Sequence, residues 1–173
     1  MKRDAESKQH KKWRIVSTII QSCLIVILIA LVGMMMFEIE HLQGTARVIN
    51  YAGLVRGATQ REMKLEVSGR QNDELIQYLD DILSGLKYED GNYDLISLDD
   101  KEYQKKLDEQ IHYWEDLKEE IQKVRDVGYR MTNIVDMSEK YFHLADETVS
   151  AAENYSEKIA KEKIGLVKDN EII

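Results

Sequence analysis

A run of 23 residues, from Ile15 to Phe37, contains no charged side chain. At a rise of about 1.5 Å per residue, a helix over this run is about 34 Å long, enough to cross the ~30 Å hydrocarbon core of a bilayer. A cleaved signal peptide has a shorter apolar region that ends in small residues, whereas this run ends Met34-Met35-Met36-Phe37. The run therefore predicts an uncleaved transmembrane helix over residues 15–37, in contact with the lipid bilayer.

The charges on either side of the run predict its orientation. Residues 1–14 carry six basic and two acidic side chains, whereas Glu38 and Glu40 follow the run. Because positively charged flanks stay in the cytoplasm, we expect a cytoplasmic N-terminus over 1–14 and an extracytoplasmic domain over 38–173. The chain has a net charge of −8, so the outer domain carries −12 once the +4 of the N-terminus is set apart. Such a surface excludes nucleic acid as a partner, since nucleic acid binds basic faces.

The composition predicts an all-α fold. The 173 residues include no proline, the residue that breaks helix interiors. Charged residues make up 32% of the chain and alternate with Leu, Ile and Tyr, as they do in amphipathic helices. The one cysteine, Cys23, lies inside the apolar run. No disulfide can form in the outer domain, so packing must hold it together.

The first half of the outer domain contains two predicted helices. The transmembrane helix is expected to continue over about 38–68 and to stop at Ser68-Gly69, where glycine supplies a left-handed cap. Asn72 followed by two acidic residues is typical of a helix start, and apolar spacing predicts a helix over 73–86 that stops near Gly85. The turn residues after it predict a loop at Lys87–Leu98.

The second half has the clearest periodicity. A helix is predicted over 99–127, with Gly128 after it, because apolar residues recur at a mean spacing of 3.5. They are Tyr103, Leu107, Ile111, Trp114, Leu117, Ile121 and Val124. A fourth helix is predicted over 132–165. Four amphipathic helices with short links predict an antiparallel four-helix bundle. Such a bundle returns its last helix to the membrane, so we expect a second crossing after Ile173 in a longer parent protein.

No motif for catalysis, cofactor binding or metal binding occurs in the sequence. A nucleophile arrangement, a glycine-rich phosphate loop and an HExxH motif are all missing. Glu139 and His143 are four residues apart and could share a helix face, but a pair without a third ligand is expected to be an ordinary surface pair. We therefore expect no enzyme active site, no cofactor and no metal site within these residues.

The segment from Ala46 to Arg61 places a charge where an apolar residue is expected. A seam with 3.5-residue spacing passes through Arg56; its members are Ile49, Gly53, Arg56, Gln60 and Met63. Gly53 and Gly57 cost the helix about 1 kcal/mol each relative to alanine, but they permit close approach by another backbone or a ligand. A guanidinium held on a seam needs an anion or a carboxylate. Two interpretations remain open: a salt bridge to a neighbouring helix, and a bound anion.

The pattern Ala-Arg-x-Ile-Asn-x-Ala-Gly-x-x-Arg-x-x-x-x-Arg at 46–61 resembles the box on the first extracytoplasmic helix of nitrate/nitrite sensor histidine kinases. Related N-terminal domains occur in type IV pilus chemotaxis transducers. In the nitrate sensors, the arginine after Ala-Gly-x-x binds the anion between the first helices of two subunits, and Arg56 has that position here. Gly57-Ala58-Thr59-Gln60 stands where the family has the bulkier Met-Gln-Ser-Tyr. The segment Leu144–Glu153 is similar to input domains of receptors that include diguanylate cyclases.

The resemblance implies a ligand-sensing input domain of a bacterial signal-transduction receptor: a histidine kinase, a diguanylate cyclase or a chemoreceptor. It also implies a homodimer through the first outer helix, with a small anion such as nitrate at the interface. The candidate ligand-binding residues are Arg56, Gly53, Gly57, Asn50 and Gln60, with Arg47 and Arg61 as secondary candidates. The alternative is a membrane-tethered helical bundle that binds a protein partner through its acidic face or the Lys87–Leu98 loop.

Overall fold

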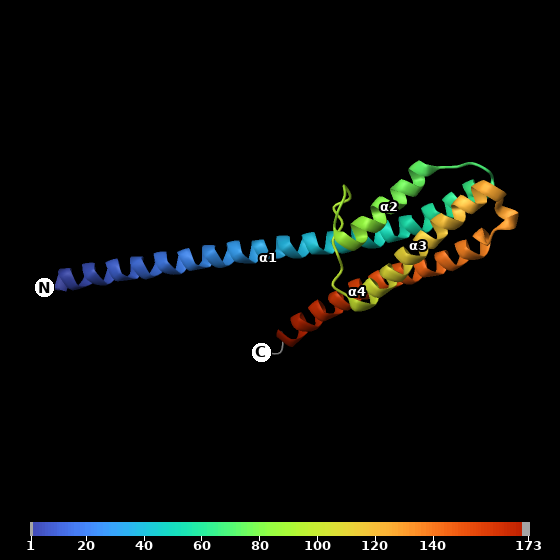
Figure 1. Cartoon of the computed structure of the whole chain (residues 1–173). Helices are drawn as coiled ribbons and strands as arrows, with labels where there is room; N and C mark the ends of the chain where they lie inside the picture. The colour runs from blue at the N-terminus through green and yellow to red at the C-terminus, as the bar shows by residue number, and fades with distance from the viewer. Residues whose placement is uncertain (1, 171–173) are drawn as a thin grey trace. The chain divides into compact units, whose positions relative to one another are not determined.

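The computed structural model describes the backbone of residues 2–170 and the side chains of residues 12–162. Over residues 2–170 it has four α-helices, one short 3-10 helix and no β-strand (Figure 1). The elements in chain order are α1 (Lys2–Val67), α2 (Asp73–Tyr88), α3 (Lys101–Val127), η1 (Tyr129–Met131) and α4 (Ile134–Asn170). The all-α prediction is confirmed. The second crossing expected after Ile173 lies outside the described residues.

The chain divides into two units, Met1–Leu42 and Gln43–Ile173. The described part of the first unit belongs to α1, and every side chain in it from Lys12 to Glu40 is exposed. Among the described residues, α1 is the one helix long enough and apolar enough to cross a membrane, with a mean hydropathy of 2.8 over an 18-residue window. The uncharged run Ile15–Phe37 lies within this helix, and its 23 residues are enough to span a bilayer core of ~30 Å.

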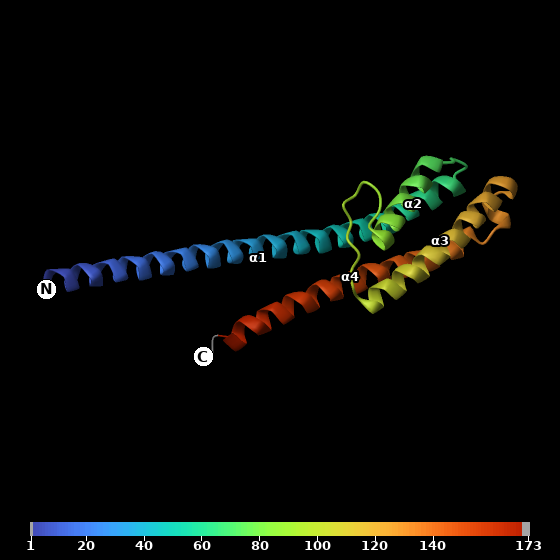
Figure 2. The same ribbon diagram turned by 60° about the vertical axis from the view of Figure 1, so that its left-hand side comes forward.

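The second unit has one hydrophobic core. All four helices contribute to it, together with the segment that links α2 to α3. Figures 1 and 2 both show α2 beside the last part of α1, and α3 beside α4. The large side chains with less than 2% exposure include Leu79, Ile82, Leu86, Leu98, Tyr103, Leu107, Trp114, Leu117, Ile121, Ile134 and Tyr141. Burial of such side chains supplies most of the free energy that holds a disulfide-free domain together.

The periodic face predicted for α3 is the face that this helix buries. Six of its seven residues are buried, and Ile111 is partly buried against the core. Two of the polar contacts between α3 and its neighbours involve side chains of its buried face. The buried Gln110 amide donates to the hydroxyl of Tyr141 on α4 at 3.1 Å, and the Trp114 indole N–H donates to Asp80 of α2 at 2.6 Å.

Local capping contacts end α1 and start α2 where the sequence predicts. Helix α1 ends at Val67, and Gly69 has a φ of +71°, the left-handed conformation expected at this stop. The N–H of Gly69 donates to the carbonyl of Glu66 at 2.9 Å. Helix α2 begins after Asn72, whose side-chain oxygen accepts a hydrogen bond from the N–H of Leu75 at 3.2 Å.

Helix α2 continues past its predicted end, because Gly85 has a packing role and does not stop the helix. It extends to Tyr88, two residues beyond the predicted 73–86. Gly85 is buried, and a Cβ atom at this position would lie 2.9 Å from the carbonyl oxygen of Asp90 and 3.1 Å from Leu95. The glycine therefore permits the following segment to fold back against α2. The left-handed residue that ends the helix is Glu89, with a φ of 59°.

The other two helices also differ from prediction at their ends. Helix α3 begins at Lys101 and not at 99, because Asp100 is its N-cap and accepts a hydrogen bond from the N–H of Tyr103 at 2.9 Å. Helix α4 spans Ile134–Asn170, against a predicted 132–165. The link between α3 and α4 contains η1 and begins at Gly128, which follows the end of α3 as predicted.

Candidate functional site

Arg56 lies beside the buried stripe of α1 and not on it. That stripe, in which each residue is at most 3% exposed, consists of Thr45, Val48, Ala52, Val55, Thr59 and Glu62. The predicted seam is wrong by one position, since Met63 is its one buried member and Ile49, Gly53, Arg56 and Gln60 are only partly buried. The two stripes share one spacing, so periodicity alone does not separate them. The buried stripe contains the polar residues Thr59 and Glu62, so its sequence does not look like that of an apolar core face.

The guanidinium of Arg56 forms an ion pair with the carboxylate of Asp146 on α4. Its Cζ atom also lies 5.8 Å from the ring centroid of Phe142 on the same helix. The Arg56 and Asp146 side chains are 35% and 50% exposed. The salt-bridge interpretation thus matches the arrangement in the structure. A pair this exposed contributes at most about 1 kcal/mol, so a small anion in solution can compete with Asp146 for the guanidinium.

The glycines next to Arg56 have no packing role within the described chain. At both Gly53 and Gly57, a Cβ atom would meet no heavy atom of another part of the described chain within 4 Å. Gly57 and Asn50 are exposed, and Gly53 is partly buried. The two glycines therefore lower the stability of the helix, and no contact within the described chain requires a glycine at either position.

The remaining candidates lie in different surroundings. The Gln60 amide donates to the backbone carbonyl of Ser138 on α4 at 3.3 Å, so Gln60 and Arg56 both contact that helix. Arg47 binds Asp94 instead, with Nη1 at 3.0 Å from its carbonyl oxygen and 3.3 Å from its carboxylate. Arg61 is exposed and has no ion-pair partner among the described residues.

The loop predicted at Lys87–Leu98 occupies residues 89–100 and packs against α1 and α2. The ring of Tyr93 lies 5.1 Å from that of Tyr51 and 6.1 Å from that of Tyr78. Ile96 covers Gly44, where a Cβ atom would lie 2.7 Å from its Cδ1. Together with the Arg47–Asp94 pair, these contacts fasten the loop across the two helices.

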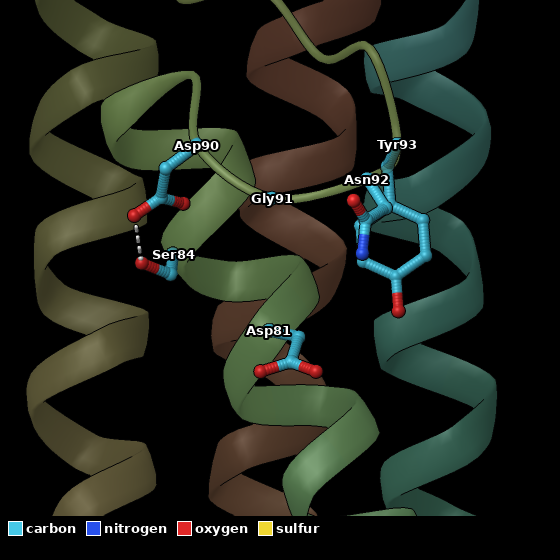
Figure 3. Close-up of a pocket in the computed structure, with 6 residues that line it drawn as sticks. All are labelled: Asp81, Ser84, Asp90, Gly91, Asn92 and Tyr93. Carbon is cyan, nitrogen blue, oxygen red and sulfur yellow. Dashed lines mark hydrogen bonds between the residues drawn. The ribbon is translucent and has the colours of Figure 1, made fainter.

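A shallow pocket of about 240 Å³ lies between this loop and α2 (Figure 3). Its lining includes two carboxylates. Asp90 accepts a hydrogen bond from the Ser84 hydroxyl at 2.8 Å, and Asp81 accepts one from the Gln77 amide at 2.7 Å. Neither carboxylate forms an ion pair within the described part of the chain. The sequence indicated this region as a turn cluster and a candidate contact loop. It did not show the pocket, because the pocket needs Asp81 of α2 and the folded loop together.

No group of three or more potential metal ligands occurs among the described residues. Glu139 and His143 are both exposed on α4. Comparisons of this chain with models of known protein families, with curated proteins and with solved structures found no match.

Proposed function

We propose that residues 38–173 form the ligand-sensing input domain of a membrane-bound bacterial receptor. The domain would be an antiparallel four-helix bundle outside the cytoplasm, anchored by Ile15–Phe37, and its output would be a histidine kinase, a diguanylate cyclase or a chemoreceptor. The observation that carries the proposal is a partly exposed arginine, Arg56, on a helix face where a Cβ atom at Gly53 or Gly57 would meet no other part of the described chain. The single apolar helix of the first unit supports the membrane anchor.

The proposed ligand is a small anion such as nitrate, bound between two copies of α1. Gly53 and Gly57 would let the two helices approach, because no side chain fills the space outside them. Close approach brings Arg56 near its counterpart, and two guanidinium groups side by side need a negative charge between them. The anion would displace Asp146 from Arg56, and a shift of about 1 Å between helices is typical of such signals.

The test is thermal unfolding of the whole chain in detergent micelles, with nitrate or nitrite added against chloride at equal ionic strength. We expect one of the two anions to raise the midpoint. Arg56→Ala should abolish that rise. Arg70→Ala removes an exposed arginine in the turn after α1 and serves as the matched control. Asp146→Asn should keep or enlarge the rise, since it removes the competing carboxylate. The proposal fails if no anion raises the midpoint or if Arg56→Ala leaves the rise unchanged.

A second function is supported by the acidic pocket beside the 89–100 loop. Asp81 and Asp90 have no cationic partner among the described residues, and the nearby Tyr88 is 70% exposed. This arrangement suits a tethered domain that binds a basic segment of a protein partner. The reading frame after Ile173 distinguishes the two functions. A second apolar run followed by a kinase, cyclase or chemotaxis module supports the receptor, whereas a stop codon supports the tethered binding domain.

A further inference from the structure

Glu62 is a buried carboxyl group without a visible hydrogen-bond donor. It lies on the core stripe of α1 with 0% exposure. Neither of its side-chain oxygens has a hydrogen-bond partner among the described residues. An ionised carboxylate in such a place is very unfavourable, because neither water nor a donor compensates its charge. A protonated carboxyl group avoids that cost and gains a donor of its own.

The neighbour of Glu62 is a second carboxylate that is already engaged. Glu66 lies one turn later on α1 and is 3% exposed. It accepts hydrogen bonds from Arg125 of α3, at 2.5 Å from Nη2 and 3.1 Å from Nε. The same guanidinium uses Nη1 to bind Asp73, the first residue of α2, at 2.7 Å. One cation therefore serves Glu66 and Asp73 and joins α1, α2 and α3.

The charge around Glu62 is unbalanced. The charges that act on it are those of Glu66 of α1, Asp73 of α2 and Arg125 of α3. Together with Glu62 itself, this end of the domain has three carboxyl groups and one guanidinium. Glu120 of α3 is also buried, but it is held by Lys123 at 2.9 Å and by the N–H of Asn133 at 2.7 Å. Beside Met63, the residue after Glu62, helix α4 presents Ile134, Val135 and Ser138, none of which is titratable.

Glu62 is the member of this pair that lacks a donor, which favours its protonated form. Burial is the main cause that raises the pKa of Glu62 to about 7. Glu66 acts in the same direction, because it can accept a hydrogen bond from the protonated form and its negative charge disfavours the ionised form, while Arg125 acts in the opposite direction. Glu66 is the acceptor, because both of its side-chain oxygens already accept hydrogen bonds from Arg125. A protonated Glu62 donates to Glu66 and thereby extends the network from Arg125 into the core.

We propose that Glu62 is a proton-operated latch at the end of the domain where α1 turns into α2. Protonated Glu62 completes the Glu66–Arg125–Asp73 network and holds α1, α2 and α3 together. Loss of the proton places a second charge beside Glu66 in the core and loosens this end. The latch does not depend on a ligand at Arg56. If the domain lies outside the cytoplasm, as the proposed function states, the pH of the surroundings determines whether Glu62 is protonated.

The sign of the pH effect follows from linkage. An ordinary glutamate loses its proton near pH 4.5, and Glu62 in the folded chain keeps it to about 7. Between these values the folded state holds a proton that the unfolded state has lost, so folding becomes less favourable as pH rises through this window. Above pH 7 the bound proton no longer contributes to the free energy of folding. The full effect on the folding equilibrium is on the order of 100-fold.

The experiment uses the whole chain in detergent micelles, with urea unfolding followed between pH 5 and 8.5. Trp13→Phe in every variant leaves the buried Trp114 as the sole fluorescent tryptophan. The unfolding midpoint of the parent should fall with rising pH. Glu62→Gln should flatten this dependence, because the amide remains a donor to Glu66 and cannot ionise. Glu119→Gln, an exposed position on α3, should keep the dependence of the parent and controls for other titrating groups.

A second measurement does not rely on the variant folding. The side-chain carboxyl carbon of Glu62, followed by ¹³C NMR in the parent chain, should titrate near pH 7. Two results would overturn the proposal: a Glu62 carboxyl that titrates near pH 4.5, or a Glu62→Gln chain that folds and keeps the pH dependence of the parent.

Discussion

At the scale of single residues, glycines with similar sequence surroundings have different roles. Gly53, Gly57 and Gly85 all lie inside helices. Gly85 is buried against the backbone of Asp90, whereas the positions outside Gly53 and Gly57 are open. A glycine in a helix costs about 1 kcal/mol relative to alanine wherever it occurs. At Gly85, packing within the chain explains why a glycine is present. At Gly53 and Gly57, the missing side chain leaves room for a partner.

This contrast gives a prediction for two alanine substitutions. Gly85→Ala should lower the free energy of unfolding by about 1–3 kcal/mol, because its Cβ atom would meet a backbone oxygen that has little room to move. Gly53→Ala should raise it by about 0.5–1 kcal/mol, because alanine favours the helix and meets nothing. Urea unfolding of both variants measures the difference. Equal effects would show that the 89–100 segment does not pack against Gly85 as described.

At the scale of elements, α2 and α3 begin where a side chain caps the first turn. Asn72 and Asp100 each accept a hydrogen bond from a backbone N–H three residues later, at 3.2 and 2.9 Å. Two adjacent aspartates precede α3, and only the second has the capping contact. The sequence showed both as a polar pair in front of an apolar pattern. The choice between them depends on backbone geometry, which is extended at Asp100 with φ −131° and ψ 125°.

The adjacent aspartates form a matched pair for a test of the cap. Asp100→Ala should lower the free energy of unfolding by about 1 kcal/mol, because it leaves the N–H of Tyr103 without its acceptor. Asp99→Ala changes an exposed residue outside the helix and should stay within about 0.5 kcal/mol of the parent. Denaturant unfolding of the two variants under one set of conditions compares them. A larger loss for Asp99→Ala would make Asp99 the cap and move the start of α3 to residue 100, which would contradict the contact described here.

At the scale of the whole molecule, the two units differ in the kind of side chain that they expose. The first unit exposes large apolar side chains between Trp13 and Leu42, which suits lipid. The second unit, from Gln43 onward, buries its apolar side chains in its own core and keeps most of its charges at the surface. The proposed orientation, with the N-terminus in the cytoplasm, depends on the charge difference across the run.

That orientation predicts the outcome of cysteine labelling in intact cells. In a Cys23→Ser background, Gln71→Cys introduces a thiol at an exposed position between α1 and α2. A reagent that does not cross membranes should label Gln71→Cys and should leave Ala5→Cys unlabelled until the cells are broken. Labelling of Ala5→Cys alone in intact cells would reverse the orientation and contradict the proposed placement of the sensor domain.

The sequence alone determined those features that depend on residues within a few turns of one another. The uncharged run, the all-α fold and the helix ends to within a few residues follow from local charge, periodicity and capping. Local sequence also made Arg56 a candidate site residue, as a charge between two glycines, and that assignment stays a prediction. Each of these signals is complete within about 20 neighbouring residues, so no tertiary contact is needed to detect it.

The tertiary structure decided which side chains meet. It selected the stripe of α1 through Val48 and Val55 over the one through Arg56, and it paired Arg56 with Asp146, 90 positions away. It also buried Glu62 beside a carboxylate held by Arg125, whose contact with Glu66 spans 59 positions. Two stripes with the same spacing satisfy periodicity equally well. Only the packing of one helix against the others determines which is buried, and hence which groups lack a partner.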